Sequence, residues 1–149
     1  MKVGLDTNVL ACAEGINDEE RHRQALGLIG QLAPDETFVP VQVLGELYDV
    51  LTRRGGYSRS YARQRVRRWI ETFPVLGTTA DGFSAAGDLA ADHNLAIWDA
   101  VVLCTVARAG CRMLLSEDMK DGFNWGGATV VNPFAASENP LLSELLDRR

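Results

Sequence analysis

The stretch VGLDTNVLACAEG, residues 3–15, begins as an apolar run and meets a carboxylate at Asp6. Residues 2–5 are typical of a short buried strand, and a helix is expected over residues 7–13. A strand that enters a core does not readily accommodate an unpaired carboxylate, because burying a charge without a partner is unfavourable. Asp6 therefore indicates either a helix cap or a functional site at the end of the first strand.

The size and composition of the chain fit one globular domain over residues 1–149. Hydrophobic residues make up 46% and charged residues 23%, which is ordinary for such a domain. No apolar run approaches the roughly 20 residues of a membrane span, and no leader-like N-terminus is recognisable. We therefore expect a cytoplasmic protein without a membrane partner. Three cysteines without a CxxC pair, Cys12, Cys104 and Cys111, are expected to be buried, reduced thiols.

Strand and helix patterns alternate along the rest of the chain. Strands are expected over residues 37–40, 73–77, 112–116 and 128–132. Helices are expected over residues 18–33, 41–53, 58–72, 80–93, 99–108 and 140–147. This alternation predicts an α/β fold with a central parallel sheet of about five strands and helices on both faces. In such sheets the functional site lies beyond the carboxyl ends of the strands.

Three carboxylates beside Asp6 stand in positions of interest. Asp118 follows an expected strand, and Asp99 opens the helix that leads into it. Capping would explain Asp6 or Asp99 taken alone, and a turn would explain Asp118. Glu46 is harder to explain, because it borders the apolar face of its helix. A glutamate there is unfavourable unless it is paired or bound to a cation.

Carboxylates that share a pocket repel one another, so at least one holds its proton unless a cation is present. A hard divalent ion such as Mg²⁺ or Mn²⁺ prefers oxygen ligands of this kind. His22 and His93 lie far apart in the sequence, which disfavours a zinc site and a Ser-His-Asp triad. A second acid, Asp121, follows three residues after Asp118, and either can complete the site.

Positive charge is concentrated in one segment of an otherwise acidic chain. The formal net charge is −5, which argues against a general nucleic-acid coat. Nearly half of the 15 lysines and arginines nevertheless fall within residues 53–68. They are Arg53, Arg54, Arg59, Arg63, Arg65, Arg67 and Arg68. A surface of this kind can bind phosphate or an acidic partner, and a solvated helix face explains it equally well.

Four segments together carry a family resemblance. LDTNVL (5–10), GELYDVL (45–51), the long segment at 97–122 and VVNPF (130–134) resemble, in this order, the PIN-domain family and in particular the VapC-type toxin ribonucleases of toxin–antitoxin pairs. The resemblance implies a Mg²⁺- or Mn²⁺-dependent endoribonuclease that cleaves RNA phosphodiester bonds with metal-activated water. The catalytic and metal-binding acids it implies are Asp6, Glu46, Asp99 and a fourth acid, which is Asp118 or, in the alternative pattern of the family, Asp121; Asp118 is favoured. The polar positions that it implies in the site are Thr7, Asn8 and Ser116.

The resemblance also implies partners: an RNA substrate, a cognate antitoxin, a second toxin copy and a larger toxin–antitoxin assembly. Backbone contacts to RNA are expected from Arg53, Arg54, Arg59, Arg63 and Arg67. Whether one metal ion or two are bound stays open. Two alternatives also remain: a catalytically idle PIN-like binding or scaffold module, and an RNA-processing nuclease outside a toxin–antitoxin pair. A phosphotransfer site is disfavoured, because no second acid adjoins Asp6.

Overall fold

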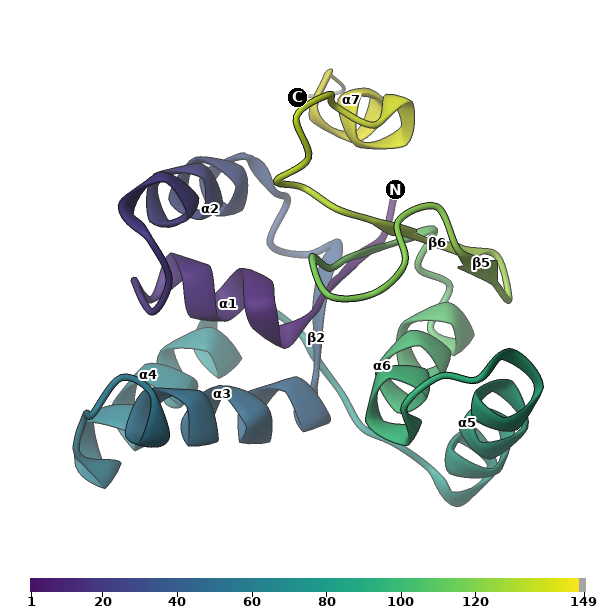
Figure 1. Cartoon of the computed structure of the whole chain (residues 1–149), viewed down its shortest axis with the longest axis horizontal. Helices are drawn as coiled ribbons and strands as arrows, with labels where there is room; N and C mark the ends of the chain where they lie inside the picture. Colours follow the sequence, from purple (N-terminus) through teal and green to yellow (C-terminus); the bar gives the residue numbers. More distant parts are fainter. Residues whose placement is uncertain (148–149) are drawn as a thin grey trace.

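Strands and helices alternate along residues 1–147, the part of the chain that the computed structural model describes (Figure 1). The strands are β1 (Val3–Leu5), β2 (Thr37–Pro40), β3 (Val75–Leu76), β4 (Met113–Leu115), β5 (Asn124–Trp125) and β6 (Ala128–Val131). The helices are α1 (Thr7–Ala13), α2 (Glu19–Gln31), α3 (Val41–Arg53), α4 (Arg59–Thr72), α5 (Ala80–His93), α6 (Ile97–Arg108) and α7 (Pro140–Asp147). Residues 148 and 149 of the expected domain lie outside the described part.

The six strands form one mixed sheet in the order β3-β2-β1-β4-β6-β5. The five strands expected from sequence are confirmed, and they pair in parallel. The sixth, β5, pairs antiparallel with β6. It was missed because its two residues, Asn124 and Trp125, do not form an apolar run like the one that revealed the equally short β3. Its turn, Gly126-Gly127 with φ of 59° and 86°, is a hairpin signal that could have revealed it.

Strand β1 lies at the centre of the sheet, between β2 and β4. Gly4 pairs with Phe38 on one side and with Leu114 on the other. A Cβ atom at Gly4 would lie 2.4 Å from Cγ1 of Val106, so glycine allows α6 to approach β1 closely. Asp99 precedes Val106 by seven residues, about 10 Å along the helix. This close packing brings the start of α6 toward the edge of the sheet where β1 ends.

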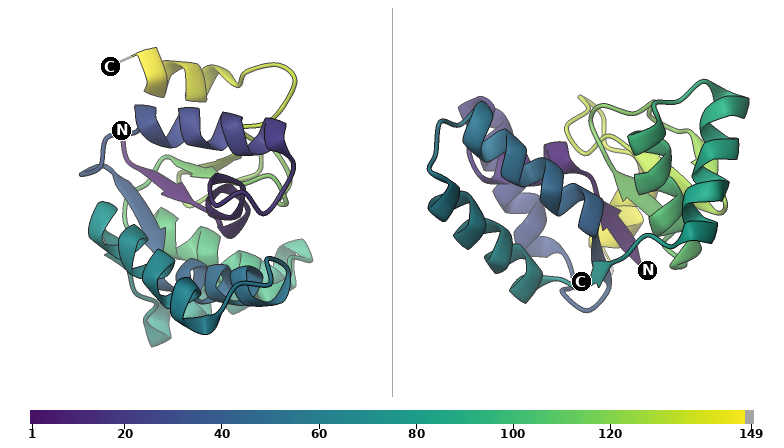
Figure 2. Two further views of the ribbon diagram at one scale, coloured as in Figure 1. Left: turned by 90° about the vertical axis from the view of Figure 1, so that its left-hand side faces the viewer. Right: turned by 90° about the horizontal axis from the view of Figure 1, so that it is seen from below.

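Helices cover both faces of the sheet, as expected. Helices α2 and α7 lie on one side, and α5 and α6 lie together on the other (Figures 1 and 2). Helix α3 packs against both α1 and α4. Strands β1 and β4 are buried along their whole length, and α6 is buried on most of its surface. The core is therefore built around the two strands that lead to Asp6 and Asp118.

The helix boundaries agree with the expected ones to within about two residues. Ser58 caps α4 as predicted, because its side chain accepts a hydrogen bond from the Tyr61 backbone N–H. Helix α6 begins earlier than expected, at Ile97, with Ala96 at the cap position. The capping explanation for Asp99 is therefore wrong, and Asp99 lies inside the first turn of the helix.

The three cysteines, Cys12, Cys104 and Cys111, are buried free thiols, as expected. Burial raises the pKa of each thiol, to about 11 for Cys111. The thiols are therefore neutral and pack as small apolar groups. Within residues 1–147, none of the helices has the length and apolar character that crossing a membrane requires.

Candidate functional site

Asp6 lies directly beyond the carboxyl end of β1 and is 5% exposed. Its Oδ1 accepts a hydrogen bond from the Thr7 backbone N–H at 2.8 Å, so Asp6 caps α1. Its Oδ2 accepts from the Ser116 hydroxyl at 2.7 Å and from the Asn8 amide at 3.3 Å. Capping is thus one part of its role, because the second carboxylate oxygen is held by residues from two different elements.

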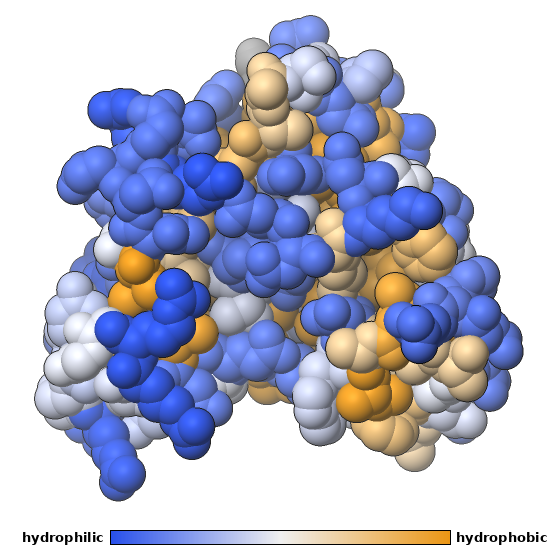
Figure 3. All heavy atoms as spheres, viewed as in Figure 1, coloured by the Kyte–Doolittle hydropathy of each residue, from blue (hydrophilic) through white to orange (hydrophobic). Residues whose placement is uncertain are grey.

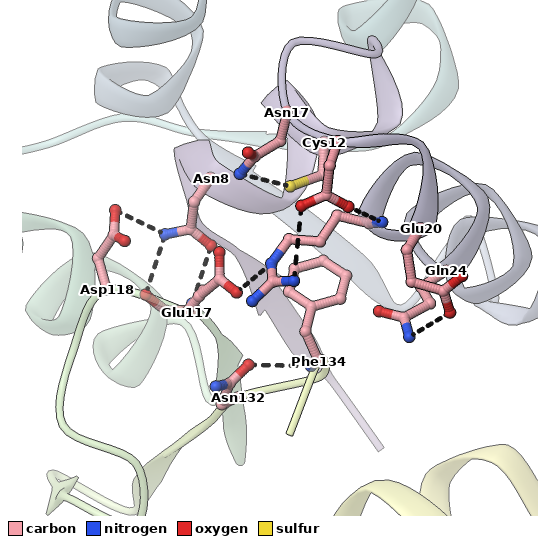
Figure 4. A network of polar contacts seen from close by, with 12 residues as sticks. Asn8, Cys12, Asn17, Glu20, Gln24, Glu117, Asp118, Asn132 and Phe134 are labelled. Carbon is pink, nitrogen blue, oxygen red and sulfur yellow. Dashed lines mark hydrogen bonds and ion pairs between the residues drawn. The ribbon is translucent and has the colours of Figure 1, made fainter. Parts of the chain in front are cut away.

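Asn8 connects α1 to the segment that follows β4 (Figure 4). Its Nδ2 donates to Ser116 Oγ at 3.2 Å and to Asp118 Oδ2 at 3.4 Å. Its Oδ1 accepts from the backbone N–H of Glu117 at 2.9 Å. One amide side chain therefore contacts each of the three residues 116–118 and orients them toward Asp6.

Glu46 reaches the same region from α3. Its Oε2 accepts from the Thr7 hydroxyl at 2.7 Å, and its Oε1 accepts from the Gln42 amide at 2.6 Å. Among the described residues, no lysine, arginine or histidine forms an ion pair with it. Gln42 was missed from sequence, although it stands four residues before Glu46, which is neighbour spacing on a helix. Glu46 is therefore a half-buried carboxylate held by neutral donors.

The four acids influence one another electrostatically. Burial raises the pKa of Asp6 to about 6, and the charges of Glu46 and Asp99 add to the increase, while the bonds from Ser116 and Thr7 oppose it. Burial also raises the pKa of Asp99, with further contributions from Glu46 and Asp118. Two acids from strand ends and two from helices thus gather negative charge at one edge of the sheet.

Asp121 faces a different neighbour. Its Oδ1 accepts from the Asn132 backbone N–H at 2.9 Å and so ties the turn before β5 to the end of β6. Its side chain is exposed, and its charge is not among the causes of the raised pKa of Asp6 or Asp99. The structure therefore brings Asp118, and not Asp121, next to Asn8.

A cavity of about 320 Å³ opens beside these acids. Polar residues lining it come from α1, from α3 and from the segments after α3 and β4: Thr7, Asn8, Glu46, Asp49, Arg54 and Asp118. Hydrophilic side chains cover the centre of this face, in the region enclosed by α1, α3 and α6 (Figure 3). Arg54 supplies a cation at the rim of an otherwise acidic cavity, where it can contact a phosphate.

Most of the remaining arginines of the 53–68 segment lie on an exposed surface. Arg59, Arg63 and Arg67 line a second cavity, of about 460 Å³, together with Tyr48. They are exposed, as is Arg53, and strongly hydrophilic surface lies over the α3–α4 region (Figure 3). Their spacing of four residues places the three on one face of α4.

Arg65 has a structural role. Its Nε and Nη2 donate to the two carboxylate oxygens of Glu14 at 2.7 Å and 2.8 Å. The Trp69 indole N–H donates to the same carboxylate at 3.1 Å. The Glu14 side chain is 3% exposed, so this pair fixes α4 against the end of α1. Sequence reasoning grouped Arg65 with the other arginines, because its partner lies 51 residues away.

The donor chemistry of the acidic cluster fits a hard divalent cation. All candidate ligands are oxygens, and burial together with neighbouring negative charge raises the pKa of Asp6 and Asp99, an effect that a bound cation would oppose. Within residues 1–147, no three His, Cys, Asp or Glu side chains are gathered closely enough to hold a metal ion. The fit therefore rests on donor chemistry, since Mg²⁺ prefers oxygen ligands, keeps several waters and uses one or two carboxylates plus substrate phosphate.

The parallel sheet with acids at its carboxyl edge, contributed by two strand ends and two helices, defines a PIN-like α/β domain. Residues 3–121 match the family model of the PIN domain, and the chain belongs to this family. The match extends from the start of β1 to Asp121, so it includes Asp6, Glu46, Asp99 and Asp118.

Solved structures with the same fold include a toxin and a toxin–antitoxin complex. The VapC20 toxin of Mycobacterium tuberculosis is 22% identical, with a TM-score of 0.68 over 78% of this chain and 90% of that one. A toxin–antitoxin complex from Klebsiella pneumoniae is 20% identical, with a TM-score of 0.68 over 89% and 98%. FitAcB from Neisseria gonorrhoeae is 16% identical, with a TM-score of 0.66 over 89% and 98%. The comparison with curated proteins gave no match.

Proposed function

We propose that this protein is a divalent-metal-dependent endoribonuclease and the toxin of a VapBC-type toxin–antitoxin pair. One observation carries the proposal. Within a PIN domain, Asp6 is 5% exposed at the carboxyl end of the central strand, and burial together with the charges of Glu46 and Asp99 raises its pKa. A buried carboxylate beside two partly buried acids is unfavourable for folding alone. Its retention is what a cation-binding catalytic site requires, and it argues against an idle scaffold.

Asp6 and Asp99 are the residues that we propose as the main ligands of Mg²⁺ or Mn²⁺, with Glu46 and Asp118 completing the acidic shell. A bound divalent ion would supply Lewis acidity and lower the pKa of a bound water. The protein has three tasks around it. Ser116 and Asn8 hold Asp6 Oδ2 in place. Thr7 and Gln42 fix the two oxygens of Glu46. Asn8 orients Asp118.

Glu46 and Asp118 are suited to orient the attacking water or to accept its proton, because both are carboxylates at the border of the open cavity. Arg54, which lines the same cavity, is suited to bind the phosphate that is attacked. The exposed arginines Arg53, Arg59, Arg63 and Arg67 would extend this contact along the RNA backbone. The RNA backbone would then run from the acidic cavity toward the α3–α4 end of the molecule.

The partner assignment rests on the fold neighbours. The Mycobacterium tuberculosis neighbour is described as a toxin that cleaves the sarcin-ricin loop. Other neighbours are toxin–antitoxin complexes, and one of them, VapBC2 from Rickettsia felis, is bound to a promoter DNA fragment. By analogy, this chain would bind a cognate antitoxin and form a homodimer within a larger assembly. An RNA substrate and buried free thiols would both be consistent with a cytoplasmic protein, which is the location that we propose.

The decisive experiment is cleavage of a structured RNA by the purified protein with Mg²⁺ or Mn²⁺, against an EDTA control and the Asp6→Asn variant. We expect cleavage that requires the metal and is lost in the variant, while circular dichroism shows both proteins folded. Cleavage in EDTA, or undiminished cleavage by Asp6→Asn, would refute the assignment. Growth arrest on expression, relieved by the protein of an adjacent reading frame, distinguishes a toxin from an RNA-processing nuclease.

A further inference from the structure

An ion pair joins α2 to the segment after β4, next to the acidic cluster but outside it. Arg21 Nε lies 2.5 Å from Glu117 Oε2. The Arg21 guanidinium also lies over the ring of Phe134, 5.7 Å from its centroid. Asp18, which caps α2, lies 3.8 Å from the same guanidinium. The Arg21 side chain is thereby held between an aromatic ring and two carboxylates.

Both the side chain and the backbone of Glu117 are held by other residues. Its side chain pairs with Arg21, and its backbone N–H donates to Asn8 Oδ1 at 2.9 Å. Its neighbours on either side, Ser116 and Asp118, both accept hydrogen bonds from Asn8 Nδ2. Figure 4 shows Glu117 between Asn8 and Phe134, with Asp118 on the far side of Asn8. The position of Glu117 therefore determines where Asn8 and Asp118 can lie.

The inference rests on the proposed function: we propose that the Arg21–Glu117 ion pair is a positioning device that fixes segment 116–118 against α2 and so holds Asn8 and Asp118 in the acidic cluster. Segment 116–118 follows the last residue of β4, beyond the strand pairing of Leu115 with Val131. Without the pair, Ser116 would stay bonded to Asp6 Oδ2 and to the Val131 carbonyl, and Asn8 to the Glu117 backbone, but the Glu117 side chain would lose its contact with α2. The planar guanidinium is suited to this role, because its donors have a fixed geometry and its face packs on Phe134.

A role in positioning differs from a role in overall stability. The Arg21 side chain is 35% exposed, and partly exposed ion pairs contribute little to the free energy of unfolding. Residues that orient the ligands of a metal, by contrast, change metal affinity or activity about 10-fold or more when removed. The pair should therefore affect Mn²⁺ binding and catalysis much more than it affects unfolding.

The test uses Arg21→Met, Glu117→Gln and the double variant, with Arg23→Met as the matched control. Arg23 is an exposed arginine two residues further along α2 that pairs with Glu20 inside its own helix. Mn²⁺ binding is measured by the EPR signal of free Mn²⁺, RNA cleavage by kcat and KM, and the exchange of the Glu117 amide by NMR. We expect each single variant to weaken Mn²⁺ binding and lower kcat about 10-fold, with KM nearly unchanged and with faster exchange of the Glu117 amide.

The double variant should lose no more than the worse single variant, because both substitutions remove the same interaction. Arg23→Met should match the wild type in every measurement. Additive losses, or wild-type Mn²⁺ binding and Glu117 exchange in Arg21→Met, would overturn the positioning role. If the wild type itself neither binds Mn²⁺ nor cleaves RNA, the proposed function fails, and the exchange of the Glu117 amide in the two single variants still decides whether the ion pair fixes the segment.

Discussion

Thr7 Oγ1 donates to Glu46 Oε2 across 2.7 Å and 39 residues of sequence. Thr7 is the first residue of α1, directly after Asp6, and Glu46 lies in the middle of α3. The bond therefore ties the end of the central strand to the helix that supplies the second acid. It also keeps the Glu46 carboxylate close enough to raise the pKa of Asp6. Four predictions follow from this cluster and the arginine surface beside it.

Stability without metal should depend on the ionisation of Asp6. Its pKa is 3.8 in an unfolded chain and about 6 in the folded protein, so the folded state binds more protons between these pH values. Its contribution to the free energy of unfolding is therefore lost as pH rises through this window, by about 3 kcal/mol in total. Urea unfolding in EDTA at several pH values, compared between wild type and Asp6→Asn, measures it. Parallel pH profiles for the two proteins would contradict the prediction.

Glu46→Gln should abolish cleavage but leave the metal-free fold as stable as the wild type or more stable. The variant removes a charge that raises the pKa of both Asp6 and Asp99, while the amide can still accept from Thr7. We expect thermal unfolding in EDTA at an equal or higher temperature, and a smaller stabilisation by Mg²⁺ than in the wild type. A decrease of about 3 kcal/mol in the free energy of unfolding would show instead that Glu46 is a structural residue.

Asp118→Asn and Asp121→Asn should separate the two candidates for the fourth acid. Asp118 borders the acidic cavity, so its substitution should weaken Mn²⁺ binding and reduce kcat by about 10-fold or more. Asp121 accepts from the Asn132 backbone N–H, so its substitution should lower the free energy of unfolding by about 1 kcal/mol and leave Mn²⁺ binding unchanged. Calorimetric titration with Mn²⁺ and urea unfolding distinguish the two outcomes. The reverse pattern would assign the metal site to Asp121.

RNA binding should depend on salt through the arginines of α4. Each arginine that neutralises one phosphate of a single strand contributes about 0.7 to the slope of log K against log salt. Arg59→Gln, Arg63→Gln and Arg67→Gln should each lower this slope, because these side chains line one exposed surface. Arg112→Gln is the control, since Arg112 is exposed at the amino end of β4, away from the acids. The measurement uses catalytically inactive Asp6→Asn protein; equal slopes in all variants would exclude this surface from RNA binding.

Local sequence patterns predicted the seven helices and five of the six strands. Apolar periodicity identified α3, and Ser58 marked the start of α4. The two-residue strand β5 gave no periodic signal. Local reasoning was also wrong about a cap at Asp99, because α6 starts two residues earlier without a side-chain cap. Helices and strands depend on short stretches of chain, so local sequence patterns predict most of them.

The sequence by itself determined the alternation of strands and helices and the places of the four acids along it: Asp6 and Asp118 after strands, Asp99 near the start of a helix and Glu46 within one. Only the tertiary structure decided which side chains meet. Ser116 and Asp6 are 110 residues apart and Asn8 and Glu117 are 109 apart, and they contact because β1 pairs with β4. Asp118 contacts Asn8, whereas Asp121 accepts from the backbone N–H of Asn132. Strand order and close helix packing set these distances, and both arise from burial of the whole core, which no local stretch of sequence encodes.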